Sequence, residues 1–130
     1  MSTSPSQILV AEDNPVNARL IVAMLERDGH EVTVVSDGGK AVAISRVEHF
    51  DLILMDVNMP EMDGLEATRQ IRAGAAPMRD VTIVALTAED DGVMQRDCIE
   101  AGMNAFLAKP VDMAALTKLL NPRVSKGRRA

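Results

Sequence analysis

The chain has 130 residues, the usual size of one domain. Its 14 basic and 19 acidic residues give a net charge of 14 − 19 = −5, and it has only two aromatic residues, which argues against a nucleic-acid-binding surface. The one cysteine cannot form an internal disulfide and no apolar run reaches membrane-spanning length, so we expect a cytoplasmic protein without membrane contact.

Five short apolar runs predict five strands that are buried on both faces. The runs are residues 8–11, 32–35, 52–55, 82–86 and 105–108. Continuous apolar runs of this length are typical of parallel strands, because helices then cover both sides of the sheet.

Helical patterns separate the predicted strands. Asn14 followed by Pro15 predicts the start of the first helix. Val16, Leu20 and Met24 recur in it at helical spacing. The later helices are predicted around Ala41, Ile44 and Val47 after a turn at 36–39, at residues 65–72, at residues 91–101, and after the cap Asp112.

This alternation predicts an α/β fold with a flavodoxin-like, doubly wound parallel sheet in the order 2-1-3-4-5 and helices on both faces. We expect a flexible lead at residues 1–6, one domain at residues 7–121 and a basic tail at residues 122–130. The tail reads either as a solvated linker or as a binding element, and its lack of an apolar pattern favours the linker.

Acidic residues follow two of the predicted strands. Glu12 and Asp13 come after the first strand and Asp56 after the third. Three clustered carboxylates need either protons or a cation, and oxygen ligands without His or Cys favour Mg²⁺, with Mn²⁺ as a substitute. A neighbouring helix N-terminus explains Glu12 and Asp13 equally well, but it does not explain Asp56.

Asp56 is the candidate nucleophile, because a carboxylate can attack phosphorus and form an acyl phosphate. The Asn58 carbonyl could add a cation ligand. Lys109, after the fifth predicted strand, could meet Asp56 or a phosphoryl oxygen. Thr87 could hydrogen-bond the same group, with small Ala88 leaving room. Taken singly, Lys109 would pass for a surface lysine and Thr87 for a strand-favouring residue.

Four segments carry these residues: Glu12-Asp13-Asn14, Asp56 to Gly64, Ala85 to Ala88, and Phe106 to Pro110. Together they resemble the response-regulator receiver domain of two-component signalling. The likeness spans residues 7–120, and it is closest to receivers of hybrid sensor histidine kinases or to stand-alone single-domain response regulators.

The resemblance implies that Asp56 accepts a phosphoryl group from a phosphohistidine in a Mg²⁺-dependent reaction. Asp13, Asp56 and the Asn58 carbonyl would be the direct metal ligands. Glu12 would act through water, and Lys109 would contact the phosphate.

The resemblance also implies a switch. Thr87 and Phe106 resemble the pair that alters the docking face around the last strand, and Phe106 lacks a hydroxyl, so packing must carry the signal. Asn58 and Glu89 occupy positions that tune dephosphorylation. The implied partners are a sensor histidine kinase or histidine phosphotransfer protein, and a downstream protein. Such a domain is not a conventional enzyme, although it catalyses its own phosphotransfer and dephosphorylation.

Three alternatives stand beside this interpretation. A phosphatase of the haloacid-dehalogenase type would have a second aspartate two residues after the nucleophile, where this chain has Asn58. A nucleotide-binding protein would carry a glycine-rich phosphate loop, and none occurs. A receiver that only docks would lack the acidic cluster or the lysine, and both are present. His30 and His49 are read as surface or boundary histidines with no carboxylate constellation around them, not as phosphodonors.

Overall fold

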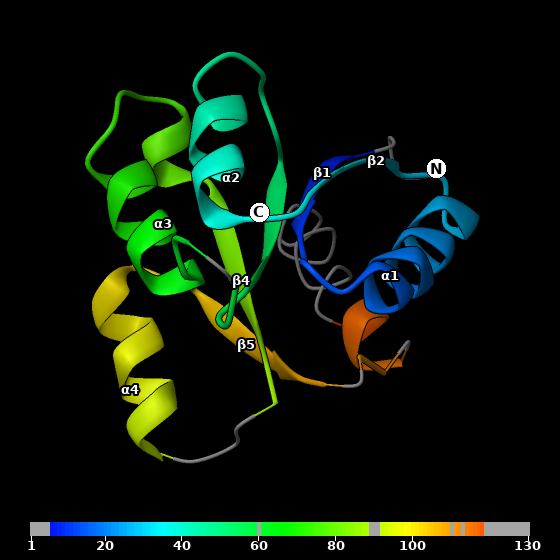
Figure 1. The fold of residues 1–130 in the computed structure, drawn as a ribbon. Helices are drawn as coiled ribbons and strands as arrows, with labels where there is room; N and C mark the ends of the chain where they lie inside the picture. Colours follow the sequence, from blue (N-terminus) through cyan, green and yellow to red (C-terminus); the bar gives the residue numbers. More distant parts are fainter. Residues whose placement is uncertain (1–5, 60, 89–91, 110, 113, 119–130) are drawn as a thin grey trace, which may run out of the picture.

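A computed structural model describes residues 6–59, 61–88, 92–109, 111–112 and 114–118. Five strands form one parallel sheet: β1 (Gln7–Ala11), β2 (Glu31–Val35), β3 (Leu52–Asp56), β4 (Thr82–Thr87) and β5 (Ala105–Ala108). Their order across the sheet is β2-β1-β3-β4-β5 (Figure 1). The predicted α/β architecture and strand order are therefore confirmed.

Helices cover both faces of the sheet. They are α1 (Pro15–Arg27), α2 (Gly38–Ser45), α3 (Gly64–Arg72), the short 3₁₀ helix η1 (Met78–Asp80) and α4 (Gly92–Ala101), and residues 114–118 are also helical. In Figure 1, α2, α3 and α4 lie on one side of the sheet, and α1 lies on the other. The Asn14 side chain accepts hydrogen bonds from the N–H groups of Val16 and Asn17, which confirms the predicted start of α1.

The core has two layers because successive strand residues face opposite sides of the sheet. On β3, Ile53 and Met55 pack in the layer beneath α2, α3 and α4, whereas Leu52 and Leu54 pack in the layer beneath α1. With both faces of β3 buried, its backbone is fixed up to its last residue, Asp56.

The apolar residues Val16 and Leu20 recur at helical spacing on α1 but are 69% and 51% exposed, and the buried face of the helix is made by Ala18, Ile21 and Leu25. Both stripes are apolar and both have helical spacing, so periodicity does not tell them apart. Two local predictions were wrong. Residues 38–39 belong to α2, not to a turn, because the Asp37 side chain caps that helix by accepting from the Lys40 N–H. The helix ends at Ser45, so Val47 lies beyond it and is exposed.

The described part of the chain contains no helix with the length and apolarity needed to cross a membrane. Apart from Ser6, the predicted lead at residues 1–6 and the basic tail at residues 122–130 lie outside the described residues. The domain boundaries therefore stay predictions.

Candidate functional site

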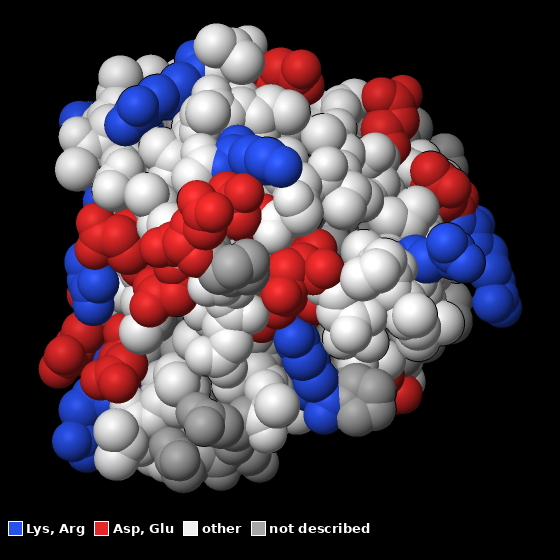
Figure 2. All heavy atoms as spheres, in the orientation of Figure 1, with Lys and Arg blue, Asp and Glu red and all other residues white. Residues whose placement is uncertain are grey.

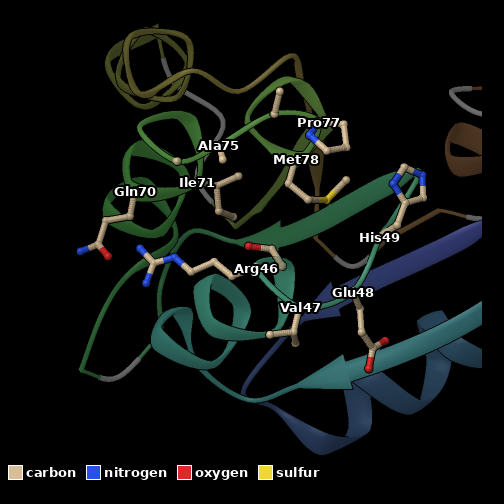
Figure 3. Close-up of a pocket in the computed structure, with 12 residues that line it drawn as sticks. Arg46, Val47, Glu48, His49, Gln70, Ile71, Ala75, Pro77 and Met78 are labelled. Atoms are coloured by element: carbon tan, nitrogen blue, oxygen red, sulfur yellow. The ribbon is translucent and has the colours of Figure 1, made fainter.

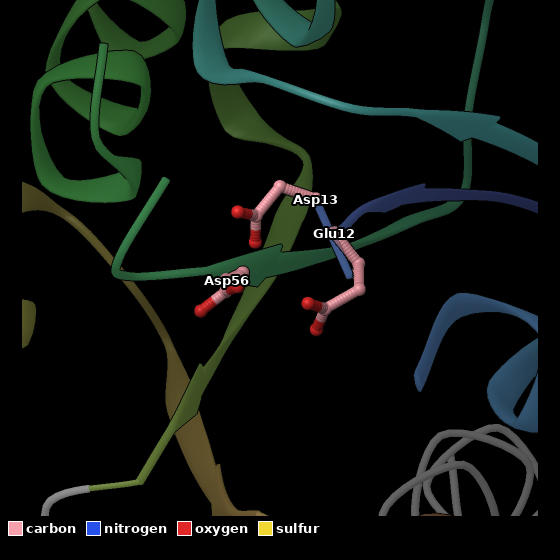
Figure 4. Close-up of side chains that lie close together, drawn as sticks. All are labelled: Glu12, Asp13 and Asp56. Atoms are coloured by element: carbon pink, nitrogen blue, oxygen red, sulfur yellow. The ribbon is translucent and has the colours of Figure 1, made fainter. Parts of the chain in front are cut away.

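The three acidic residues singled out from the sequence lie together at the carboxyl edge of the sheet. Glu12 follows β1 and Asp56 ends β3, and the pairing of Ala11 with Met55 puts these neighbours side by side. One carboxylate oxygen each from Glu12, Asp13 and Asp56 lies within 4.8 Å of the others (Figure 4). Glu12 and Asp56 are only 2% and 1% exposed, whereas Asp13 faces solvent.

Lys109 brings a positive charge to this cluster. Its Nζ lies 2.9 Å from Asp56 Oδ2 and 3.3 Å from Glu12 Oε1, and its side chain is 19% exposed. The Lys109 N–H donates to the Thr87 carbonyl oxygen, so the backbone continues the pairing of β5 with β4. Among the described residues, this one ammonium group is paired with two buried carboxylates, and the Asp13 carboxylate lies beside them, so the site is short of positive charge. Acidic side chains also gather over the middle of one face of the molecule (Figure 2).

Two buried oxygens of this cluster lack a hydrogen bond among the described residues: Glu12 Oε1 and Asp56 Oδ2. Both lie at ion-pair distance from Lys109, but neither is aligned with a donor. The other two oxygens are used locally, since Glu12 Oε2 accepts from the Asn14 N–H and Asp56 Oδ1 from the Asn58 N–H. Buried oxygens left without donors, in a set of oxygen ligands only, fit a hard divalent cation such as Mg²⁺.

Burial and crowding shift the protonation of this cluster. The pKa of Asp56 is raised to about 6, mainly by burial; the nearby Lys109 ammonium group opposes the rise, and repulsion from Glu12 adds to it. Burial alone would lower the pKa of Lys109, but the Asp56 carboxylate, followed by that of Glu12, raises it above its usual value. The site thus holds Lys109 charged and gives Asp56 an appreciable affinity for a proton.

The remaining candidate residues lie around this cluster. Thr87 ends β4 and is buried, and the exposed Ala88 follows it. Phe106 lies on β5, pairs with Ala85 of β4 and packs against the core layer beneath α4. The Asn58 side chain is exposed. Glu89 lies outside the described residues.

A hollow of about 430 Å³ lies at the opposite, amino edge of the strands (Figure 3). Residues 45–49, which precede β3, form one wall, and Gln70, Ile71 and residues 74–78 form the other. His49 lies beside it with Nε2 3.3 Å from Asp51 Oδ1, a single neighbouring carboxylate among the described residues. No group of three possible metal-ligating side chains lines the described walls, in contrast to the carboxyl edge with Glu12, Asp13 and Asp56.

Two features were not predicted from the sequence. The exposed stripe of α1 lies next to the acidic cluster, because Leu20 and Lys109 line the same small hollow. Arg72 donates hydrogen bonds to the carbonyl oxygens of Gly102, Arg79 and Val81, and to Asn104 Oδ1. The sequence indicates the exposed stripe only weakly, because the helix carries two apolar stripes at helical spacing. The sequence does not indicate the role of Arg72, because three of its four acceptors are backbone carbonyls.

The chain matches the family described as response regulator receiver domain over residues 8–121. It is 39% identical over 122 residues to the sensor protein GacS of Pseudomonas syringae, covering 92% of this chain but 14% of GacS. It is 34% identical over 116 residues to the protein PilH of Pseudomonas aeruginosa, covering 89% of this chain and 95% of PilH. The chain thus spans a small part of the sensor protein and almost all of PilH.

Two solved structures share the fold and the sequence pattern. The receiver domain of sensor histidine kinase PA1611 from Pseudomonas aeruginosa, solved with a magnesium ion coordinated in its active site cleft, is 44% identical with a TM-score of 0.84. The match covers 92% of this chain and 97% of that one. The receiver domain of Ssk1 from Saccharomyces cerevisiae, solved with the histidine phosphotransfer protein Ypd1, is 32% identical with a TM-score of 0.80. That match covers 88% of this chain and 85% of the other.

Proposed function

The chain belongs to the response regulator receiver domain family of two-component signalling, and on that premise we propose that it accepts a phosphoryl group from a phosphohistidine onto Asp56. Receiver domains are signalling domains and not conventional enzymes. The observation that carries the proposal is the buried Asp56 carboxylate, which lies 2.9 Å from Lys109 and within 4.8 Å of two further acids.

In the proposed reaction, an Asp56 carboxylate oxygen attacks the phosphorus of the phosphohistidine. The new P–O bond forms as the P–N bond breaks, and the electron pair of that bond stays on the imidazole nitrogen. The attack requires ionised Asp56, which a pKa of about 6 allows at neutral pH. Lys109 balances the charge of the acyl phosphate.

Asp13, Asp56 and the Asn58 carbonyl would hold Mg²⁺ directly, and Glu12 would hold it through water. Mn²⁺ has the same preference for oxygen and would substitute. A bound divalent cation neutralises charge on the phosphoryl oxygens during the transfer. The two buried oxygens without hydrogen bonds support this assignment.

We assign the switch to Thr87 and Phe106, on the adjacent strands β4 and β5. The Thr87 hydroxyl would turn toward the phosphoryl group beside the small Ala88. Phe106 would follow by repacking and alter the surface around β5 that a downstream protein reads. Asn58 and Glu89 would tune loss of the phosphoryl group, which the domain catalyses on itself.

The phosphodonor would dock on the exposed stripe of α1. Val16 and Leu20 present an apolar surface there, and Leu20 shares a small hollow with Lys109. A helical histidine phosphotransfer protein or the phosphorylated helix of a sensor kinase fits this surface, because an apolar stripe beside the acids would hold a histidine over Asp56. The Ssk1 receiver is itself a partner of such a protein.

Residues 7–121 would form the working domain, between the predicted lead at residues 1–6 and the basic tail at residues 122–130. The domain would act in the cytoplasm, which the lone, buried Cys98 fits as a reduced thiol.

Phosphorylation by a small phosphodonor tests the proposed chemistry. Incubation with phosphoramidate and Mg²⁺ should add one phosphoryl group to the intact mass, Mn²⁺ should replace Mg²⁺, and excess chelator should abolish the product. A product of equal yield in chelator would overturn the need for a cation. No product with either cation would favour a receiver that only docks.

A further inference from the structure

The N-terminus of α2 contacts the β3–α3 segment, which follows Asp56 and is described at residues 57–59 and 61–63. The Gly38 N–H donates to the Met62 carbonyl oxygen over 3.2 Å. A Cβ atom on Gly38 would overlap that oxygen and would lie 3.1 Å from the Asp63 carbonyl oxygen. Only glycine therefore allows α2 to approach the segment this closely.

A second glycine holds the other side of the same segment. The Gly64 N–H donates to the Val57 carbonyl oxygen over 2.9 Å. A Cβ atom on Gly64 would overlap the Asp56 carbonyl oxygen and lie 2.9 Å from Met55 Cγ. The segment is thus fixed to β3 through Gly64 and to α2 through Gly38.

The backbone within this segment requires such support. Glu61 has a φ of +68°, in the left-handed region that costs a residue with a side chain free energy. Strained backbone of this kind persists only where the surroundings hold it. Met62, the next residue, is the one that Gly38 contacts.

The same segment supplies atoms to the acidic cluster. The Asn58 N–H donates to Asp56 Oδ1 over 3.1 Å, and the Asn58 carbonyl is the third direct cation ligand of the proposed function. A change in the path of the segment would therefore move a ligand without touching any of the carboxylates.

We propose that Gly38 is a positioning residue for the cation site: the first turn of α2 holds the Met62 carbonyl and so aims the Asn58 carbonyl at the cation. This inference rests on the proposed function. It makes the entry of α2, a helix that contributes no side chain to the acidic cluster, part of the phosphorylation machinery.

The test compares Gly38→Ala with Gly39→Ala, which adds the same methyl group to the same turn. A Cβ atom on Gly39 meets only Asp37 Oδ1, at 3.3 Å, and no atom of the β3–α3 segment. Mg²⁺ affinity, measured by calorimetry, should fall about tenfold in Gly38→Ala. Loss of a group that orients a metal ligand typically lowers metal affinity by about 10- to 100-fold, and we expect the lower end of that range. Gly39→Ala should bind Mg²⁺ like the wild type.

Two further readouts separate positioning from a general loss of stability. In chelator, amide hydrogen exchange at Asn58 and Gly64 should quicken in Gly38→Ala, while exchange in β1 should not. The rate of phosphorylation by phosphoramidate should recover as Mg²⁺ is raised, whereas a smaller folded fraction would lower the rate at every Mg²⁺ concentration.

Should Gly38→Ala fail to fold, Asp37→Ala takes its place, because it removes the cap of α2 without adding atoms. If the wild type binds Mg²⁺ and is phosphorylated, but the folded variant binds Mg²⁺ with unchanged affinity, the positioning role is overturned and the proposed function stands. A wild type that does neither overturns the proposed function instead.

Discussion

Lys109 and Asp56 form an ion pair across an intervening strand: Nζ at the end of β5 lies 2.9 Å from Oδ2 at the end of β3, and β4 lies between them. The pair therefore exists only when three strands are in register. It links the fold of the sheet directly to the charge balance of the acidic cluster.

Removal of this cation should destabilise the metal-free protein. Lys109→Ala leaves Asp56 and Glu12 buried without a positive partner, which costs about 3 kcal/mol where both stay ionised and less where Asp56 takes up a proton. Urea unfolding at about pH 8 in chelator measures the loss. Lys40→Ala is the control, because Lys40 is exposed and its ion pair with Asp37 is long, at 3.9 Å, so its loss should cost little. Equal unfolding curves for the two variants would contradict the charge balance described here.

The stability of the metal-free protein should depend on the ionisation of Asp56. Its folded pKa of about 6 exceeds the ordinary 3.8, so the folded state binds the proton more tightly than the unfolded state does. The stability that the folded state gains from this tighter proton binding is fully present below about pH 4. It is lost as pH rises through about 6, because the buried carboxylate then ionises.

Asp56→Asn removes this dependence, because an amide does not ionise. In chelator, the variant should gain stability over the wild type as pH rises from about 4 to about 6, by an amount of order 1–3 kcal/mol. Mg²⁺ should reduce the difference at neutral pH by stabilising the wild type. A gap between the two unfolding free energies that is the same at every pH would show that Asp56 is not perturbed.

The exposed stripe of α1, with Val16 and Leu20, should affect the rate of phosphoryl transfer from protein donors but not from small phosphodonors. Leu20→Glu places a charge on the proposed docking surface and should slow transfer from a phosphorylated histidine phosphotransfer protein at least about tenfold, a loss near 1.4 kcal/mol. Phosphorylation by phosphoramidate should keep its rate. Val47→Glu, an equally polar change at an exposed residue on the opposite edge of the sheet, is the control. A loss with both donors would indicate damage to the acidic cluster.

Strand order and the meeting of Asp13, Asp56 and Lys109 could be predicted, because parallel strands put their carboxyl ends at one edge and each of these residues follows an apolar run. The buried face of α1 could not be predicted, since two apolar stripes share the helix. The role of Gly38 could not either, because Asp37-Gly38-Gly39 reads equally as a turn. The proton affinity of Asp56 depends on burial and on the placement of Glu12, which are tertiary properties.

Arg72 should be a strong contributor to stability. Its guanidinium joins α3 to the residues before β4 and β5 through four acceptors, three of them backbone carbonyls. Arg72→Ala leaves these acceptors without their charged donor and should lower the unfolding free energy by about 2–4 kcal/mol. Arg69→Ala, which removes only an exposed pair with Glu66, should change it by less than about 1 kcal/mol. Similar urea midpoints for the two variants would contradict this role.

The central claim is that Asp56 carries the phosphoryl group. Transfer from a radiolabelled phosphohistidine protein in Mg²⁺ should label the wild type and Asp51→Asn, a control at the opposite edge of the sheet, but not Asp56→Asn. The label on the wild type should be stable in acid and released by hydroxylamine, as an acyl phosphate is. Equal labelling of Asp56→Asn and the wild type would contradict the account.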